Sequence, residues 1–128
     1  MPPSPESLRR ALSDRVVVSD GAMGTMLQAY DLGLADFQGH EGCNEILNIT
    51  RPDIVREVHE AHLDVGVDCV TSNTFGANVA NLGEYGIAER IYELARAGAA
   101  IAREAADAWA SVDMRGNELL KRGSSNAR

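Results

Sequence analysis

Two short β-branched runs, each followed by a polar turn and later by a helical pattern, constrain the fold of this chain most. The first run spans residues 15–19 and reads Arg-Val-Val-Val-Ser, and the second spans residues 67–75 and begins Val-Asp-Cys-Val. Helical patterns follow at 50–66 and from about 87 to 109. Strands that alternate with helices pair in parallel, with right-handed crossovers that place the helices outside. The order therefore predicts an α/β fold, while pattern alone leaves a closed barrel and an open sheet both possible.

The first long helix carries clear start and stop signals. Thr50 is predicted to cap it, Pro52 suits its first turn, and Asp53 favours the positive end of the helix dipole. Gly66 is predicted to end the helix in a left-handed conformation. The second helix carries an apolar stripe, and Gly98 is the residue that weakens the prediction of a continuous helix there.

The remaining segments show weaker patterns of apolar and polar residues. Residues 4–14 place Leu8 and Leu12 four apart, which indicates a short amphipathic helix or turn. Residues 28–50 lack a clear period and are interpreted as a long connection with room for one helical turn. Residues 111–128 hold few apolar side chains, so they predict a divergent, disordered tail without a third strand. A domain boundary is therefore expected near residue 110.

Composition excludes several classes of function. Twelve Lys and Arg against nineteen Asp and Glu give a net charge of -7, which disfavours nucleic acid as a partner. No apolar stretch approaches the ~20 residues of a membrane helix, and the polar opening does not resemble a signal peptide. Cys43 and Cys69 match no CxxC pattern, so we expect reduced thiols and a cytoplasmic location.

The turn after the first predicted strand offers groups that suit an amino acid. Ligands gather at the carboxyl ends of parallel strands, and the sequence there reads Asp20, Gly21, Ala22, Met23, Gly24. Backbone N–H groups of this glycine-bearing turn can point at a carboxylate, and the Asp20 carboxylate can hold an ammonium group. The alternative is a tight turn in which the aspartate accepts local hydrogen bonds.

The end of the second predicted strand is also polar. Residues 71–74 read Thr-Ser-Asn-Thr, and alternation sends Asn73 and Thr74 to opposite faces. One of these faces would lie at the ligand-binding edge of the sheet. The alternative is that Asn73 and Thr74 satisfy backbone groups of the loop.

Candidate metal ligands occur but lack metal-binding spacing. His59 and His62 lie three apart on a predicted helix, without the spacing of the HExxH motif, and are interpreted as packing or surface residues. His40 and Cys43, with Cys69 as a third ligand, would lack a fourth group. The sequence therefore predicts no metal site in this chain.

Four motifs in order resemble one enzyme family. They are Asp20-Gly-Ala-Met-Gly-Thr-Met-Leu-Gln28, Gly42-Cys-Asn-Glu-Ile-Leu-Asn48 with Thr50-Arg-Pro-Asp53, Thr71-Ser-Asn-Thr-Phe-Gly-Ala-Asn78, and Asn81-Leu-Gly-Glu-Tyr-Gly86. From about Leu8 to Trp109 the chain resembles the homocysteine-binding module of the cobalamin-dependent methionine synthases. The resemblance implies a (β/α)8 TIM barrel and methyl transfer to homocysteine to give methionine. Betaine- and S-methylmethionine-dependent homocysteine methyltransferases remain an alternative, although residues 42–45 look more like the cobalamin-dependent branch.

The resemblance also implies roles and cofactors. Asp20 matches the residue that holds the substrate amino group, and the backbone of residues 21–24 would receive the carboxylate. Asn73 and Thr74 would lie on the second strand end, which faces the same barrel mouth. No catalytic residue is assigned. In the full-length family enzyme a zinc ion held by cysteine thiolates binds the homocysteine sulfur, and methyltetrahydrofolate supplies the methyl group through cobalamin. Neither Cys43 nor Cys69 lies in the sequence context of those zinc ligands.

Length limits what this chain can form by itself. A TIM barrel needs ~250 residues, so residues 1–110 are expected to form about the first two βα units plus an N-terminal helix. We expect a truncated chain that lacks methyltransferase activity in isolation and self-associates through open strand edges. A non-catalytic interaction protein is the remaining alternative.

Overall fold

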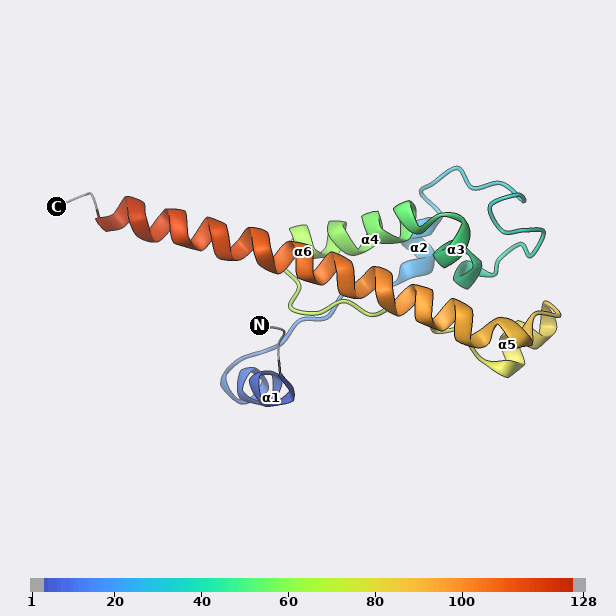
Figure 1. Ribbon diagram of the computed structural model, residues 1–128, viewed down its shortest axis with the longest axis horizontal. Helices are drawn as coiled ribbons and strands as arrows, with labels where there is room; N and C mark the ends of the chain where they lie inside the picture. Colours follow the sequence, from blue (N-terminus) through green and yellow to red (C-terminus); the bar gives the residue numbers. More distant parts are fainter. Residues whose placement is uncertain (1–3, 126–128) are drawn as a thin grey trace.

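The computed structural model describes residues 4–125, and the side chains of residues 4–111. Figure 1 shows a long C-terminal helix with shorter elements gathered along its first half. The helical elements in chain order are α1 (Pro5–Asp14), α2 (Met23–Leu27), η1 (Asn44–Ile46), α3 (Leu47–Thr50), α4 (Pro52–Asp64), α5 (Val79–Glu84), η2 (Ala88–Arg90) and α6 (Ile91–Ser125).

The core lies between α4 and α6, which run side by side (Figure 1). One buried cluster joins both helices to α2 and α3, and a second joins α6 to η1 and α5. The first consists of Leu27, Leu47, Ile54, Val55, Val58 and Ile101, and the second of Cys43, Ile46, Leu82, Ile87 and Leu94. Burying an aliphatic side chain of this size contributes about 1.5–3 kcal/mol, so these clusters hold the helices together.

The predicted helices form, with one correction at a helix start. Ser4 caps α1, Gly66 follows α4 with φ of 95°, and α6 covers the predicted second long helix from Ile91 onward, while residues 88–90 form η2. The predicted capping by Thr50 is wrong, because Arg51 is the N-cap residue of α4. Thr50 instead ends α3, and its hydroxyl donates to the backbone oxygen of Asp36 at 2.5 Å.

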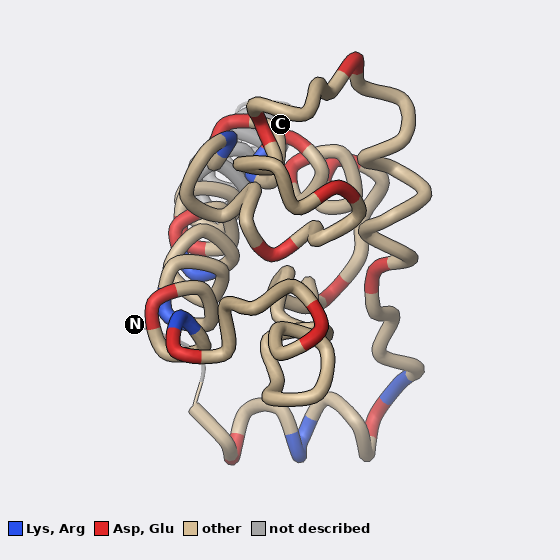
Figure 2. Tube along the Cα trace, turned by 90° about the vertical axis from the view of Figure 1, so that its right-hand side faces the viewer, with Lys and Arg blue, Asp and Glu red and all other residues tan. Residues whose placement is uncertain are grey.

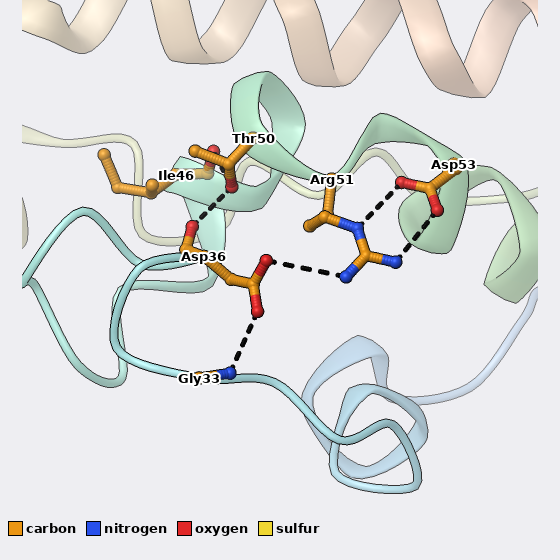
Figure 3. A network of polar contacts seen from close by, with 6 residues as sticks. All are labelled: Gly33, Asp36, Ile46, Thr50, Arg51 and Asp53. Carbon is orange, nitrogen blue, oxygen red and sulfur yellow. Dashed lines mark hydrogen bonds and ion pairs between the residues drawn. The ribbon is translucent and has the colours of Figure 1, made fainter.

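The long connection over residues 28–50 is fixed by a polar network (Figure 3). The Asp36 carboxylate accepts from the Gly33 N–H at 2.9 Å and pairs with Arg51 at 3.5 Å. Arg51 also pairs with Asp53 at 3.0 Å. These contacts tie the middle of the connection to the start of α4, although its sequence shows no helical or strand period.

Three segments differ from the sequence-based description. The short helix α2 begins inside the predicted glycine-bearing turn, and α5, for which no element was predicted, is capped by Asn78, which accepts from the Asn81 N–H. The backbone of α6 continues as helix through residues 111–125, which were expected to be disordered, and residues 126–128 lie outside the described residues. The domain boundary at residue 110 stays a prediction.

The two predicted strand segments meet side by side. Within residues 4–125 their pairing consists of one parallel bridge between Ser19 and Cys69. The Asp20 N–H donates to the Cys69 oxygen at 3.1 Å, and the Asp68 N–H donates to the Val18 oxygen at 2.8 Å. Val18 is 49% exposed rather than buried, because the described residues place only one neighbouring segment beside it. A barrel built on this pair stays a prediction.

Acidic residues are distributed along most of the chain trace, and basic residues are fewer (Figure 2). This agrees with the net charge of -7. None of the helices among the described residues has the length and apolar character that crossing a membrane requires.

Candidate functional site

Asp20 joins the ends of the two strand segments. It directly follows the bridge residue Ser19, and its carboxylate accepts from the Thr71 N–H at 3.0 Å and from the Ser19 hydroxyl at 3.2 Å. The side chain is half-buried. An ionised carboxylate has about four acceptor positions, so Asp20 retains capacity for an ammonium group while it holds the second segment in place.

The backbone N–H groups that follow Asp20 are available as donors. Within the described part of the chain, no hydrogen-bond acceptor contacts the N–H of Gly21, Ala22, Met23 or Gly24. Gly21 and Ala22 are exposed, and Met23 and Gly24 are half-buried. Exposed donors beside a carboxylate can receive the carboxylate of a zwitterion whose ammonium group lies on Asp20.

Two histidines of α4 lie next to this turn. His59 is fully buried, and neither ring nitrogen has a hydrogen-bond partner among the described residues. Burial lowers the His59 pKa, and the negative charge of Asp20 opposes that shift. His62 approaches Gly21: a Cβ at Gly21 would lie 3.4 Å from the His62 Nε2 atom. His59 is thus buried, and α4 brings both rings to the turn rather than away from it.

The two cysteines lie in different environments. Cys43 is buried and donates its S–H to the Glu45 carboxylate at 3.7 Å, and burial raises the pKa of its thiol. Cys69 is exposed at the parallel bridge. His40 packs edge-on against Tyr85. Among the described residues, no three His, Cys, Asp or Glu side chains converge on one point, so these residues do not fit a zinc ion.

Asn73 faces inward at the second strand end. Its side-chain amide donates to the Asn44 oxygen at 2.9 Å and to the Asn48 Oδ1 atom at 3.0 Å, and the residue is 5% exposed. The Thr74 hydroxyl pairs with that of Ser72 at 2.7 Å. The alternative, in which Asn73 satisfies a backbone group, therefore holds for one of its two donated hydrogen bonds, and the other goes to the Asn48 side chain. Direct contact of Asn73 or Thr74 with a ligand stays a prediction.

Sequence reasoning assigned no role to the buried polar residues around Asn73. The Glu45 carboxylate accepts from the Gly76 N–H at 2.7 Å, and the Asn81 side chain donates to the Gly76 oxygen at 2.9 Å. Asn48 donates to the Asn73 oxygen. The signal that could have found Glu45 and Asn48 is their position at both ends of an apolar pair, Ile46-Leu47, because polar residues in a buried run need partners.

Comparison with known proteins finds close similarity over most of the chain. A family model described as homocysteine S-methyltransferase matches residues 17–122. A methionine synthase from Mycobacterium tuberculosis is 58% identical over 102 residues, which cover 80% of this chain and 9% of that protein. A methionine synthase from Mycobacterium leprae is 51% identical over 106 residues, which cover 83% of this chain and 9% of that protein. The chain thus spans about 9% of the length of these relatives, and the family match extends past residue 110.

Proposed function

This chain belongs to the homocysteine S-methyltransferase family, and we propose that it supplies the headgroup-binding part of an enzyme that methylates homocysteine to methionine. The observation that carries the proposal is the pairing of Asp20 with the unpartnered N–H groups of residues 21–24 within the described residues. Homocysteine carries an ammonium and a carboxylate group on one carbon atom, and this turn offers a counterpart for each.

Each group of the turn receives one task. The Asp20 carboxylate accepts from the substrate ammonium, a charge-assisted hydrogen bond that is about twice as strong as a neutral one. The N–H groups of Gly21 to Gly24 donate to the substrate carboxylate. Because the Thr71 N–H holds one Asp20 oxygen at 3.0 Å, the carboxylate is oriented before substrate arrives, which lowers the entropic cost of binding.

The fold we propose around this site is a (β/α)8 barrel. In that arrangement residues 15–19 and 67–75 are neighbouring strands, and α4 and α6 cover their outer side. The parallel bridge between Ser19 and Cys69 and the parallel course of α4 and α6 support it. Asp20, Asn73 and Thr74 then lie at the carboxyl ends of the strands, where barrel enzymes bind their substrates.

The resemblance to methionine synthases favours methyltetrahydrofolate and cobalamin over betaine as the methyl source of the whole enzyme. It also implies zinc, and no group of three candidate metal ligands converges among the described residues. No chemical step is assigned here to zinc or cobalamin. The task of this segment is to bind and orient the amino-acid end of homocysteine.

Calorimetric titration with two ligands tests the proposal. Homocysteine is compared with mercaptobutyric acid, which lacks the amino group, for the wild type, Asp20→Asn and the control Asp31→Asn. Asp31 is exposed, and its change to Asn removes the same single charge. None of its contacts involves the turn. We expect Asp20→Asn to weaken homocysteine binding by about tenfold, the scale of one charged hydrogen bond.

The test compares how Asp20→Asn changes the affinity for each of the two ligands. Mercaptobutyric acid should bind the wild type and Asp20→Asn equally, since it lacks the group that Asp20 holds. A wild type that binds no homocysteine, or an Asp20→Asn variant that loses both ligands equally, would contradict the assignment of Asp20 as the amine anchor.

A further inference from the structure

We propose that Asn48 is a positioning residue for the proposed homocysteine site: it fixes the second strand end, and through that segment it orients Asp20. The inference rests on the proposed function, which assigns Asp20 to the substrate ammonium. Asn48 itself does not contact the turn. Its effect travels through residues 71–73, which connect its partner Asn73 to the Thr71 N–H that contacts Asp20.

The Asn48 side chain is fully engaged in holding that segment. It is 3% exposed, its Nδ2 atom donates to the Asn73 oxygen at 2.8 Å and to the Leu94 oxygen at 3.1 Å, and its Oδ1 atom accepts from the Asn73 side chain. Both amide hydrogens thus meet carbonyl oxygens, and the oxygen meets an N–H group. This pattern fixes the orientation of the amide, because a flipped amide would place its oxygen against two carbonyl oxygens.

Asn48 also anchors the segment to α6. Gly98 makes the approach possible: a Cβ at this position would lie 2.7 Å from the Asn48 Nδ2 atom and 3.1 Å from the Asn73 oxygen. Real Cβ atoms essentially never come within 3.0 Å of a neighbour, so the distance to the Asn48 Nδ2 atom excludes a side chain at Gly98 without a shift. Gly98, in the middle of α6, is therefore the position at which the Asn73 backbone and the Asn48 amide pack against the helix.

The chain from Thr71 to Gly76 is held at three points. The Thr71 N–H donates to Asp20, Asn73 exchanges hydrogen bonds with Asn48, and the Gly76 N–H donates to Glu45. The Thr74 N–H also donates to the Ser72 oxygen at 2.8 Å, so the backbone turns at Asn73. Only Ser72 separates Asn73 from Thr71, so a displacement of Asn73 also displaces the N–H group that orients the Asp20 carboxylate.

The test combines amide NMR spectra with homocysteine titration. Asn48→Asp keeps the shape of the side chain and removes both donated hydrogen bonds. Val58→Ala is the control, since it lowers stability from a fully buried site on α4 within a cluster that contains none of residues 71–73. We expect Asn48→Asp to move the Thr71 and Asn73 amide signals and to weaken homocysteine binding by about tenfold, while Val58→Ala leaves affinity within about twofold.

The outcomes separate this inference from the proposed function. Unchanged Thr71 and Asn73 signals overturn it, and moved signals with unchanged affinity overturn it as well, because the role would then be structural only. A wild type that binds no homocysteine overturns the proposed function. In that case movement of the Asp20 and Thr71 signals alone decides whether Asn48 orients the carboxylate. If Asn48→Asp does not fold, Asn48→Gln, which keeps every donor but is one methylene longer, carries the same measurements.

Discussion

The buried His59 imidazole lies close enough to the Asp20 carboxylate for the negative charge to act on the histidine pKa. Burial has the larger effect and lowers that pKa, and neither ring nitrogen has a partner among the described residues. The most buried titratable side chain of α4 thus lies within reach of the charge of the proposed amine anchor.

Acid should destabilise the protein through His59. The unfolded state takes up a proton near the ordinary histidine pKa of about 6.5, whereas the folded state resists it, so stability is complete above that pH and falls below it. Urea unfolding from about pH 8 to about pH 5 measures the effect. Asp53 and Asp68, whose pKa values are lowered by Arg51 and Arg15, titrate below this range.

His59→Leu is the matched variant for that experiment. It removes the titrating ring and the two unpartnered nitrogens at nearly constant volume, so we expect a flatter pH profile. At neutral pH its stability should equal that of the wild type or exceed it by about 1 kcal/mol. An unchanged slope below about pH 6.5 would assign the acid effect to other groups.

Gly98→Ala should destabilise the protein although alanine is the better helix former. The new methyl group would lie 2.7 Å from the Asn48 Nδ2 atom and 2.8 Å from the Thr74 Cγ2 atom. Overpacking of this kind costs about 1–3 kcal/mol, measurable by thermal or urea unfolding. Gly83→Ala in α5, where nothing lies within 4 Å of the added carbon, is the control and should be neutral or stabilising by up to about 1 kcal/mol. Equal effects of both changes would rule out the close approach at Gly98.

Thr50→Val should loosen the connection over residues 28–50. The change keeps the side-chain shape and removes the hydroxyl that donates to Asp36, leaving that oxygen without this donor. We expect a loss of about 1 kcal/mol and faster amide exchange at Gly33 and Asp36. Thr25→Val, at an exposed position of α2, is the control, and equal exchange in the two variants would count against the network in Figure 3.

Alkylation should distinguish the two cysteines. Cys69 is exposed, whereas Cys43 is buried with a raised thiol pKa, and thiolates are the reactive form. Iodoacetamide at neutral pH should therefore modify Cys69 first, and Cys43 only when the protein opens or unfolds. Peptide mass spectrometry over a time course measures the order in which the two cysteines are modified. The Cys69→Ser variant should stay unmodified under the same conditions, and rapid labelling of that variant would show that Cys43 is accessible.

The sequence predicted the parts of the fold that depend on local chemistry. Pro52 and Gly66 bound the first long helix because their backbone preferences act without tertiary partners. Thr50 was misassigned because its hydroxyl meets the Asp36 oxygen, a contact that the local pattern cannot contain. The exposure of Val18 likewise depends on what lies beside it in space rather than on its neighbours in sequence.

The candidate site was predicted in part, for the same reason. Asp20 and its glycines form a local pattern, and the family motifs pointed to them directly. The role of Asn48 was not predicted, since it depends on contacts with Asn73 and Leu94, which lie 25 and 46 residues away. Long-range partners of a buried amide leave no periodic signal in a single sequence.

A parallel pair with one backbone bridge could slip along its length, because a shift by one residue turns every side chain to the other face. Here two carboxylates flank the bridge between Ser19 and Cys69, and each holds one segment to the other. Asp68 accepts from the Val18 N–H at 2.8 Å, and Asp20 accepts from the Thr71 N–H. A slipped register would break both contacts at once. The alignment of the two segments is therefore set by side chains, and the residue that anchors substrate in our proposal is also one that keeps the two segments in register.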